Sequence, residues 1–139
     1  MKKVLFLLII FLFSFKSVNA GIYGRGEIKL SYYVQDIFIE YIKGGHGKTP
    51  SVFVVTKDGS EATFWYCPAG QANCMAPDPN EYINICEREF GKECAIFARN
   101  RTIRWKSEKN PGKGKKSKFN SKWDRSKMIN KLKELGFVD

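Results

Sequence analysis

The chain has 139 residues, of which 24 are lysine or arginine and 14 are aspartate or glutamate, for a formal net charge of +10. This length is typical of one domain, with enough surface to bury for a modest single core. The four cysteines form no Cys-x-x-Cys pair and there is one histidine, which excludes a typical Cys/His zinc site. We therefore expect neither a metal nor a cofactor.

Residues 1–20 have the pattern of a cleaved secretory signal peptide. Two lysines precede an apolar run over residues 4–15, and the small residues Val18 and Ala20 stand at positions −3 and −1 before Gly21. The run is shorter than the roughly 20 residues that span a bilayer. We expect cleavage between Ala20 and Gly21 and an exported protein, periplasmic or secreted, with no transmembrane anchor in its mature form. Disulfides form in such compartments.

Charge is distributed unevenly along the predicted mature chain. Residues 21–98 contain seven basic and ten acidic side chains, a net charge of −3, whereas residues 99–139 contain fourteen basic and four acidic ones, a net charge of +10. This asymmetry indicates an acidic partner for the basic half. Outside the cell that partner is anionic lipid, lipopolysaccharide, acidic polysaccharide or stray nucleic acid, and the compartment excludes intracellular nucleic acid.

The first predicted helix covers Ser31–Lys43, where apolar residues recur with helical spacing. Ser31 is a suitable N-cap, and the Gly44-Gly45 pair is a suitable end. Just before this helix, Glu27–Leu30 is interpreted as a short edge strand.

Two apolar runs, Ser51–Thr56 and Ala62–Cys67, predict a β-hairpin. The Asp58-Gly59 pair between them is a strong turn signal. Because both faces of these strands carry apolar residues, we expect each side of the sheet to be covered.

A loop over Pro68–Pro77 leads to a second predicted helix, which runs from Asp78 and Pro79 to about Phe90. Gly91 follows as its stop. A second hairpin is predicted from Ala95–Ala98 and Thr102–Trp105, turning around Asn100.

The last part of the chain is predicted to be a basic loop followed by a helix. Residues 111–120 are rich in glycine and lysine without periodicity, which is typical of a solvated, mobile arm. After Asp124, a suitable N-cap, an apolar stripe predicts a closing helix that Gly136 ends. The stripe consists of Met128, Ile129, Leu132 and Leu135.

These elements predict an α+β fold. We expect a mostly antiparallel four-stranded sheet built from two hairpins, with two helices packed on it and two disulfides. The expected domain covers residues 21–106, the basic Gly/Lys-rich loop covers 107–123, and the C-terminal helix over 124–139 packs on the same domain.

The four cysteines favour local pairing, Cys67 with Cys74 and Cys86 with Cys94. Each bridge closes a short loop and stabilises the fold by about 2–3 kcal/mol in the chain-entropy account. A crossed pairing or free thiols remain alternatives. In either case the cysteines are interpreted as structural.

The basic half is the leading functional candidate, because its cations are interleaved with aromatic residues that suit a polyanion with stackable or amphiphilic groups. The candidate anion-binding residues are Arg99, Arg101, Arg104, Lys106, Lys113, Lys115, Lys116, Lys118 and Lys122. The aromatic residues beside them are Trp105, Phe119 and Trp123. In the alternative interpretation, the lysines only solvate a loop while Trp105 and Trp123 pack into the core.

Other functional interpretations rest on weaker signals. The glycine-rich segment around His46 resembles a phosphate-binding loop but has Ile42 where that motif needs its first glycine. A periplasmic enzyme or enzyme inhibitor would use His46 and the loop Pro68–Pro77. An exported cationic toxin is a third hypothesis, although no long amphipathic helix with a basic face supports it.

Two stretches resemble small exported bacterial proteins of uncharacterised activity. The first begins at Cys86-Glu87, continues through Gly91 and runs from Cys94 to Trp105. The second combines Pro111–Gly114, Phe119–Trp123 and Lys131–Phe137. This resemblance implies an exported, disulfide-bearing protein and assigns no activity or catalytic residue.

Overall fold

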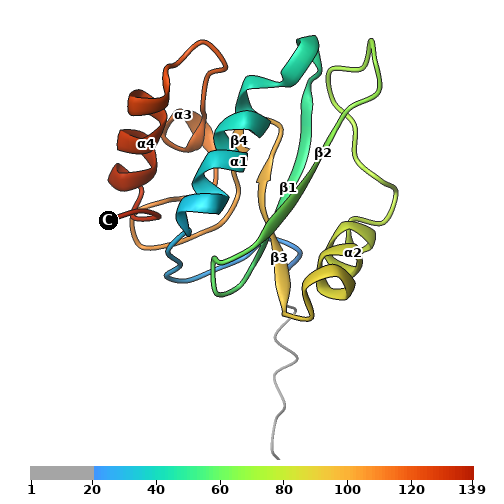
Figure 1. Ribbon diagram of the computed structural model, residues 1–139, viewed down its shortest axis with the longest axis horizontal. Helices are drawn as coiled ribbons and strands as arrows, with labels where there is room; N and C mark the ends of the chain where they lie inside the picture. Colours follow the sequence, from blue (N-terminus) through green and yellow to red (C-terminus); the bar gives the residue numbers. More distant parts are fainter. Residues whose placement is uncertain (1–20) are drawn as a thin grey trace, which may run out of the picture.

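The computed structural model describes residues 21–139, so the predicted signal peptide lies outside the described residues. It confirms the α+β fold (Figure 1). In chain order the elements are α1 (Tyr32–Lys43), the short 3-10 helix η1 (Gly45–Gly47), β1 (Pro50–Thr56), β2 (Ala62–Tyr66), α2 (Asn80–Phe90), β3 (Cys94–Arg99), β4 (Thr102–Ile103), α3 (Gly114–Ser117) and α4 (Arg125–Glu134).

The four strands form one antiparallel sheet in the order β2-β1-β3-β4. Both predicted hairpins are confirmed, and their first strands, β1 and β3, are neighbours in the sheet. The prediction that the second hairpin reaches Trp105 is wrong, because β4 ends at Ile103. There the backbone N–H groups of Arg104 and Trp105 both donate to the Phe97 carbonyl, at 2.8 and 3.1 Å, and the chain leaves the ladder.

Every residue of β1 is buried, because both faces of the sheet are covered as expected. Helices α1 and α4 lie on one face, where Phe53 and Val55 belong to the larger core. Helix α2 covers the other face, where Val52, Val54 and Ile96 form a smaller cluster (Figure 1).

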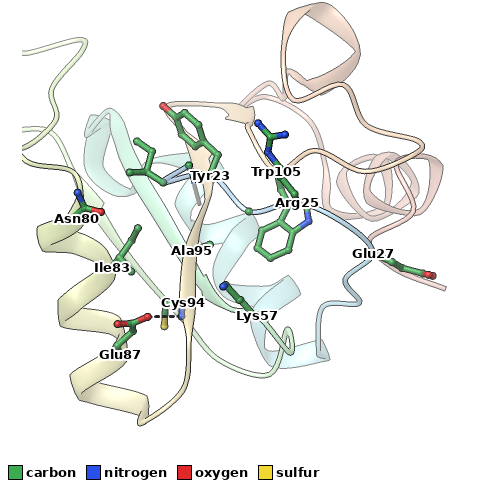
Figure 2. Close-up of a pocket in the computed structure, with 13 residues that line it drawn as sticks. Tyr23, Arg25, Glu27, Lys57, Asn80, Ile83, Glu87, Cys94, Ala95 and Trp105 are labelled. Atoms are coloured by element: carbon green, nitrogen blue, oxygen red, sulfur yellow. Dashed lines mark hydrogen bonds between the residues drawn. The ribbon is translucent and has the colours of Figure 1, made fainter. Parts of the chain in front are cut away.

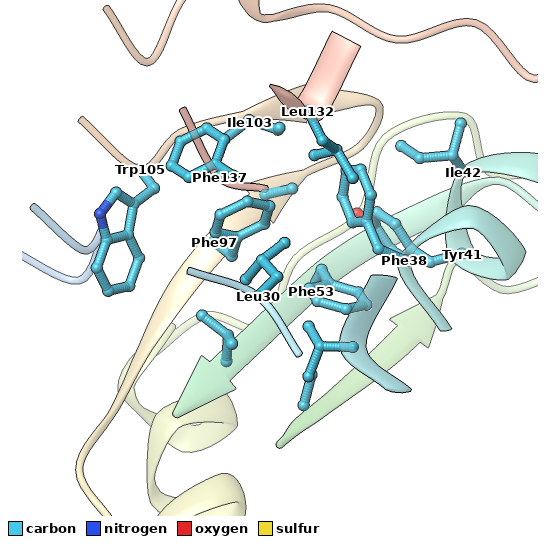
Figure 3. Packing of buried hydrophobic residues seen from close by; sticks show 14 of the residues in the cluster. Leu30, Phe38, Tyr41, Ile42, Phe53, Phe97, Ile103, Trp105, Leu132 and Phe137 are labelled. Atoms are coloured by element: carbon cyan, nitrogen blue, oxygen red, sulfur yellow. The ribbon is translucent and has the colours of Figure 1, made fainter. Parts of the chain in front are cut away.

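The larger core is organised around Phe38 of α1 (Figure 3). Its ring meets Phe53 of β1, Phe97 of β3 and Phe119 nearly at right angles, with centroids 5.2, 5.5 and 5.3 Å away. Such edge-to-face pairs each contribute about 0.5–1.5 kcal/mol beyond the area they bury. Phe119 belongs to the predicted basic loop, so this core reaches directly beneath the lysine-rich part of the chain.

The helix ends confirm the predicted caps of α1 and α4. The Ser31 hydroxyl accepts a hydrogen bond from the Val34 N–H at 3.2 Å, and Gly44 ends α1 in a left-handed conformation. Asp124 accepts from the Lys127 N–H at 2.8 Å at the start of α4. These bonds satisfy donors that a helix cannot pair within itself.

The predicted edge strand over Glu27–Leu30 is absent. Ile28 and Leu30 are buried and Glu27 and Lys29 are exposed, so the alternating pattern reflects core packing without a strand partner. Instead, Tyr23 and Arg25 form parallel bridges to Ile96 and Lys106. The short β4 leaves part of the β3 edge open, and the segment after Gly21 pairs there.

Both predicted disulfides are confirmed, and no cysteine among residues 21–139 is free. Cys67 and Cys74 close the loop after β2, with Cα atoms 5.6 Å apart. Cys86 and Cys94 join α2 to the start of β3, with Cα atoms 6.2 Å apart. Two such bridges are consistent with folding outside the cytoplasm.

The turn between β1 and β2 depends on the carboxylate of Asp58. This group accepts hydrogen bonds from the Ser60 hydroxyl at 2.6 Å, the Thr56 hydroxyl at 2.7 Å and the Ser60 N–H at 3.0 Å, and it pairs with Lys92 at 3.0 Å. The hydrogen bonds from Ser60 and Thr56 hold the pKa of Asp58 well below its ordinary value of 3.8. The folded protein therefore favours the charged form.

We expect Asp58→Asn to lower the free energy of unfolding at neutral pH, because it removes the charge that these hydrogen bonds and Lys92 stabilise. The loss should be only about 1 kcal/mol, because the carboxylate is half exposed. A depressed folded-state pKa contributes stability above the unfolded pKa and loses it as the pH falls through the folded one. The difference between wild type and variant should therefore shrink below about pH 4 in urea unfolding. An equal difference at neutral and strongly acidic pH would contradict this role.

Candidate functional site

The basic segment, residues 107–123, is anchored to the domain through Asn110, which is fully buried. Its side-chain amide donates to the Trp105 carbonyl at 2.7 Å and accepts from the Ser117 hydroxyl at 2.6 Å. The Phe119 N–H donates to the Arg101 carbonyl at 2.7 Å. The prediction of a solvated loop over residues 111–120 is therefore wrong for these anchors, and the segment includes the short helix α3.

Gly112 lets the segment turn closely over the stretch of chain that follows β4. It adopts a φ of +72°, and a Cβ atom there would meet the Arg104 carbonyl oxygen at 2.7 Å. The Pro-Gly-Lys-Gly pattern therefore reflects a tight fixed turn.

The lysines of the basic segment lie on the outside of this anchored turn. Lys113, Lys115, Lys116 and Lys118 are all exposed. None of them is among the ion pairs within residues 21–139, which use other cations of the fold. Lys106 and Lys122 are likewise exposed and outside those ion pairs. The anchored turn therefore presents positive charge that no carboxylate of the described chain neutralises.

The predicted anion-binding arginines are half-buried and hold the fold together. The Arg101 Nε donates at 2.8 Å to the Ile42 carbonyl in the last turn of α1, a favourable place for a cation. The Arg104 guanidinium lies 4.9 Å from the centre of the Tyr23 ring. Arg99 donates through Nη2 to the Asn73 side-chain oxygen at 3.3 Å. The three arginines therefore differ from the exposed lysines in having partners within the fold.

Arg101 also lies close to a buried phenol, Tyr41 of α1. Burial raises the pKa of Tyr41 well above its ordinary value, and the charge of Arg101 opposes that effect. The Tyr41 hydroxyl therefore stays neutral at physiological pH and adds no charge beside Arg101.

The three aromatic residues predicted to support binding are placed differently from one another. Trp105 and Phe119 are 2% and 1% exposed and belong to the larger core, so neither ring is exposed beside the lysines. Trp123 is half-buried, and the Lys127 ammonium lies 4.8 Å from the centre of its ring. Of the three aromatic residues, Trp123 is therefore the one that is partly exposed.

His46, the candidate for an enzymatic role, lies in η1 and is exposed. It makes no hydrogen bond to a carboxylate within residues 21–139. The loop Pro68–Pro77 is closed by its disulfide and held to the sheet by the Ser51 hydroxyl, which donates to the Cys74 carbonyl at 2.7 Å. No cluster of three or more histidine, cysteine or acidic side chains in the described part of the chain could hold a metal ion.

No protein-family model matches the chain, and no match is found among curated proteins or solved structures. Among the described residues, no helix combines the length and apolarity needed to cross a membrane.

Sequence reasoning missed Asn110 and Ser117, the buried polar pair that orders the basic segment. Both residue types are common in solvated loops, and the surrounding glycines and lysines strengthen that interpretation. The only hint was the apolar Phe119, which a fully solvated arm would not bury.

Proposed function

We propose that the protein is an exported binding module that engages an anionic component of the cell envelope through the exposed lysines of its anchored turn. These are Lys113, Lys115, Lys116 and Lys118, called the anchored lysines below. The signal-peptide pattern and the two disulfides support export. The observation that carries the binding proposal is the ordered turn, which holds Lys113, Lys115, Lys116 and Lys118 exposed and without ion pairs among residues 21–139.

Order in the turn favours binding because little backbone freedom is lost when a partner docks. Binding to a polyanion also releases condensed counterions, so the affinity should fall steeply with salt. On an anionic membrane each nearby lysine contributes about 1 kcal/mol. Four lysines together give the strength expected of a reversible surface interaction.

The kind of cation favours recognition of charge density over recognition of a particular shape. A lysine ammonium is a compact point charge, whereas arginine binds phosphate or carboxylate through two fixed hydrogen bonds. The arginines here are engaged within the fold. Anionic lipid, lipopolysaccharide and acidic polysaccharide all suit such a surface.

The test compares the wild type with a variant in which Lys113, Lys115, Lys116 and Lys118 are changed to glutamine. Binding to vesicles containing anionic lipid, to lipopolysaccharide and to heparin is measured at about 50 mM and about 200 mM salt. We expect the variant to bind anionic vesicles about a hundredfold to a thousandfold more weakly at low salt, and its salt dependence to be smaller.

A matched control changes four lysines of the other half, Lys29, Lys48, Lys57 and Lys92, to glutamine. This removes the same charge, and the exposed ion pairs it breaks contribute little to stability. Equal losses in the two variants would show that net charge alone drives the binding. Binding that is insensitive to salt would overturn the proposal.

A further inference from the structure

A cavity of about 520 Å³ lies between α2, the start of β3 and the segment 21–25, and none of the four anchored lysines lines it. In Figure 2, Asn80, Ile83 and Glu87 of α2 line one side, and Arg25, Lys57 and Trp105 lie on the other. The segment 21–25 and the start of β3 complete the walls. The volume lies within the range of small-molecule sites.

The cavity exists because the edge of β3 that faces away from β1 has no strand neighbour at its first residues. β4 pairs only with Ala98 and Arg99, and the segment after Gly21 bridges β3 at Ile96. The edge at Cys94 is therefore open, and the disulfide to Cys86 holds α2 beside it. Fixed walls of this kind form a largely preformed site.

The walls combine an apolar surface with cations that have few partners. Ile22, Ile83 and Ala95 supply the apolar part. Arg25 is exposed and is absent from the ion pairs within residues 21–139, and Lys57 pairs only with the exposed Glu93, at 3.6 Å.

The acidic side chains of the lining are less available than the cations. A carboxylate oxygen of Glu87 accepts the Cys94 N–H at 3.2 Å, which satisfies the open edge of β3. Figure 2 shows the Glu27 side chain directed away from the cavity. The groups of the lining that stay available to a ligand are therefore the two cations and the apolar side chains.

We propose that this cavity binds a small organic anion, in which a carboxylate or similar group pairs with one of its two cations, Lys57 or Arg25, and an apolar body packs between Ile22 and Ile83. Such a ligand leaves the Glu87 hydrogen bond intact. The cavity does not include the anchored lysines, so this proposal does not depend on the function proposed above.

The probe for this test is 4-phenylbutyrate, with 4-phenylbutan-1-amine as a cation of matched shape. Binding is followed by amide chemical shifts in NMR spectra of the protein beginning at Gly21. We expect affinity for the carboxylate in about the millimolar range, as its size implies. The shift changes should centre on Gly24, Ile83 and Ala95, and the amine should not bind.

Lys57→Gln or Arg25→Gln, whichever removes the cation that pairs with the carboxylate, should weaken binding about tenfold, while Lys92→Gln, a change to an exposed lysine outside the cavity lining, should not change it. The dispersion of the same spectra shows that each variant is folded. Absence of shift changes at these amides, equal binding of the amine, or wild-type affinity in both cation variants would overturn the proposal. The variant lacking the four anchored lysines should retain this binding.

Discussion

Phe38→Ala is expected to lower the free energy of unfolding by about 3–5 kcal/mol. Phe38 is fully buried and contacts the rings of Phe53, Phe97 and Phe119. Its loss leaves a cavity where α1, the sheet and the basic segment meet. A domain of this size is stable by only about 5–15 kcal/mol, so the variant should unfold at markedly lower urea concentration.

Tyr33→Ala is the matched control for this prediction. Tyr33 lies in the first turn of the same helix, but 55% of it is exposed. Its removal should change stability by no more than about 0.5 kcal/mol. Similar losses for the two variants would contradict the assignment of Phe38 to the centre of the core.

Asn110→Ala is expected to lower the free energy of unfolding by about 2–4 kcal/mol. The change removes both side-chain hydrogen bonds of Asn110 and leaves the Trp105 carbonyl and the Ser117 hydroxyl buried without partners. It should also loosen the turn that carries the lysines, and so weaken binding to anionic vesicles although no charge is removed. Thermal unfolding and vesicle binding measure the two effects.

Asn120→Ala provides the control within the same segment. Asn120 is exposed, and its side-chain oxygen accepts only the Lys122 N–H at 2.9 Å. This variant should keep nearly wild-type stability and binding. If Asn110→Ala also leaves both unchanged, the buried amide does not order the turn.

Local signals explain why much of the fold could be predicted. Ser31 and Asp124 cap the helices they precede, and Asp58-Gly59 marks the first hairpin turn. The cysteine pairing followed from short spacing in a chain that the sequence predicts to be exported. Each of these features depends on residues within about one or two turns of one another, where sequence patterns are informative.

The features that could not be predicted depend on distant parts of the chain. Pairing of Tyr23 beside Ile96 requires that β4 end early, and β4 ends because two N–H groups share the Phe97 carbonyl. The order of strands also required the pairing of β1 with β3. No local pattern encodes these contacts.

For the candidate site, the sequence located the positive charge but did not separate its roles. Arginine and lysine count equally in a sum of charges. In the structure, however, Arg101 donates a hydrogen bond to the Ile42 carbonyl in the last turn of α1, while Lys116 is exposed. The separation depends on which cations find partners in the folded chain. It also depends on Asn110 and Ser117, whose burial only the tertiary structure reveals.

Lys113, Lys115, Lys116 and Lys118 lie on an ordered turn of a folded domain. Backbone ¹⁵N relaxation of the amides from Lys113 to Lys118, compared with those of β3, tests this claim most directly. Order parameters near about 0.85, like those of the strand, are the expected result. Values below about 0.6 across these amides would show a flexible arm and contradict the claim.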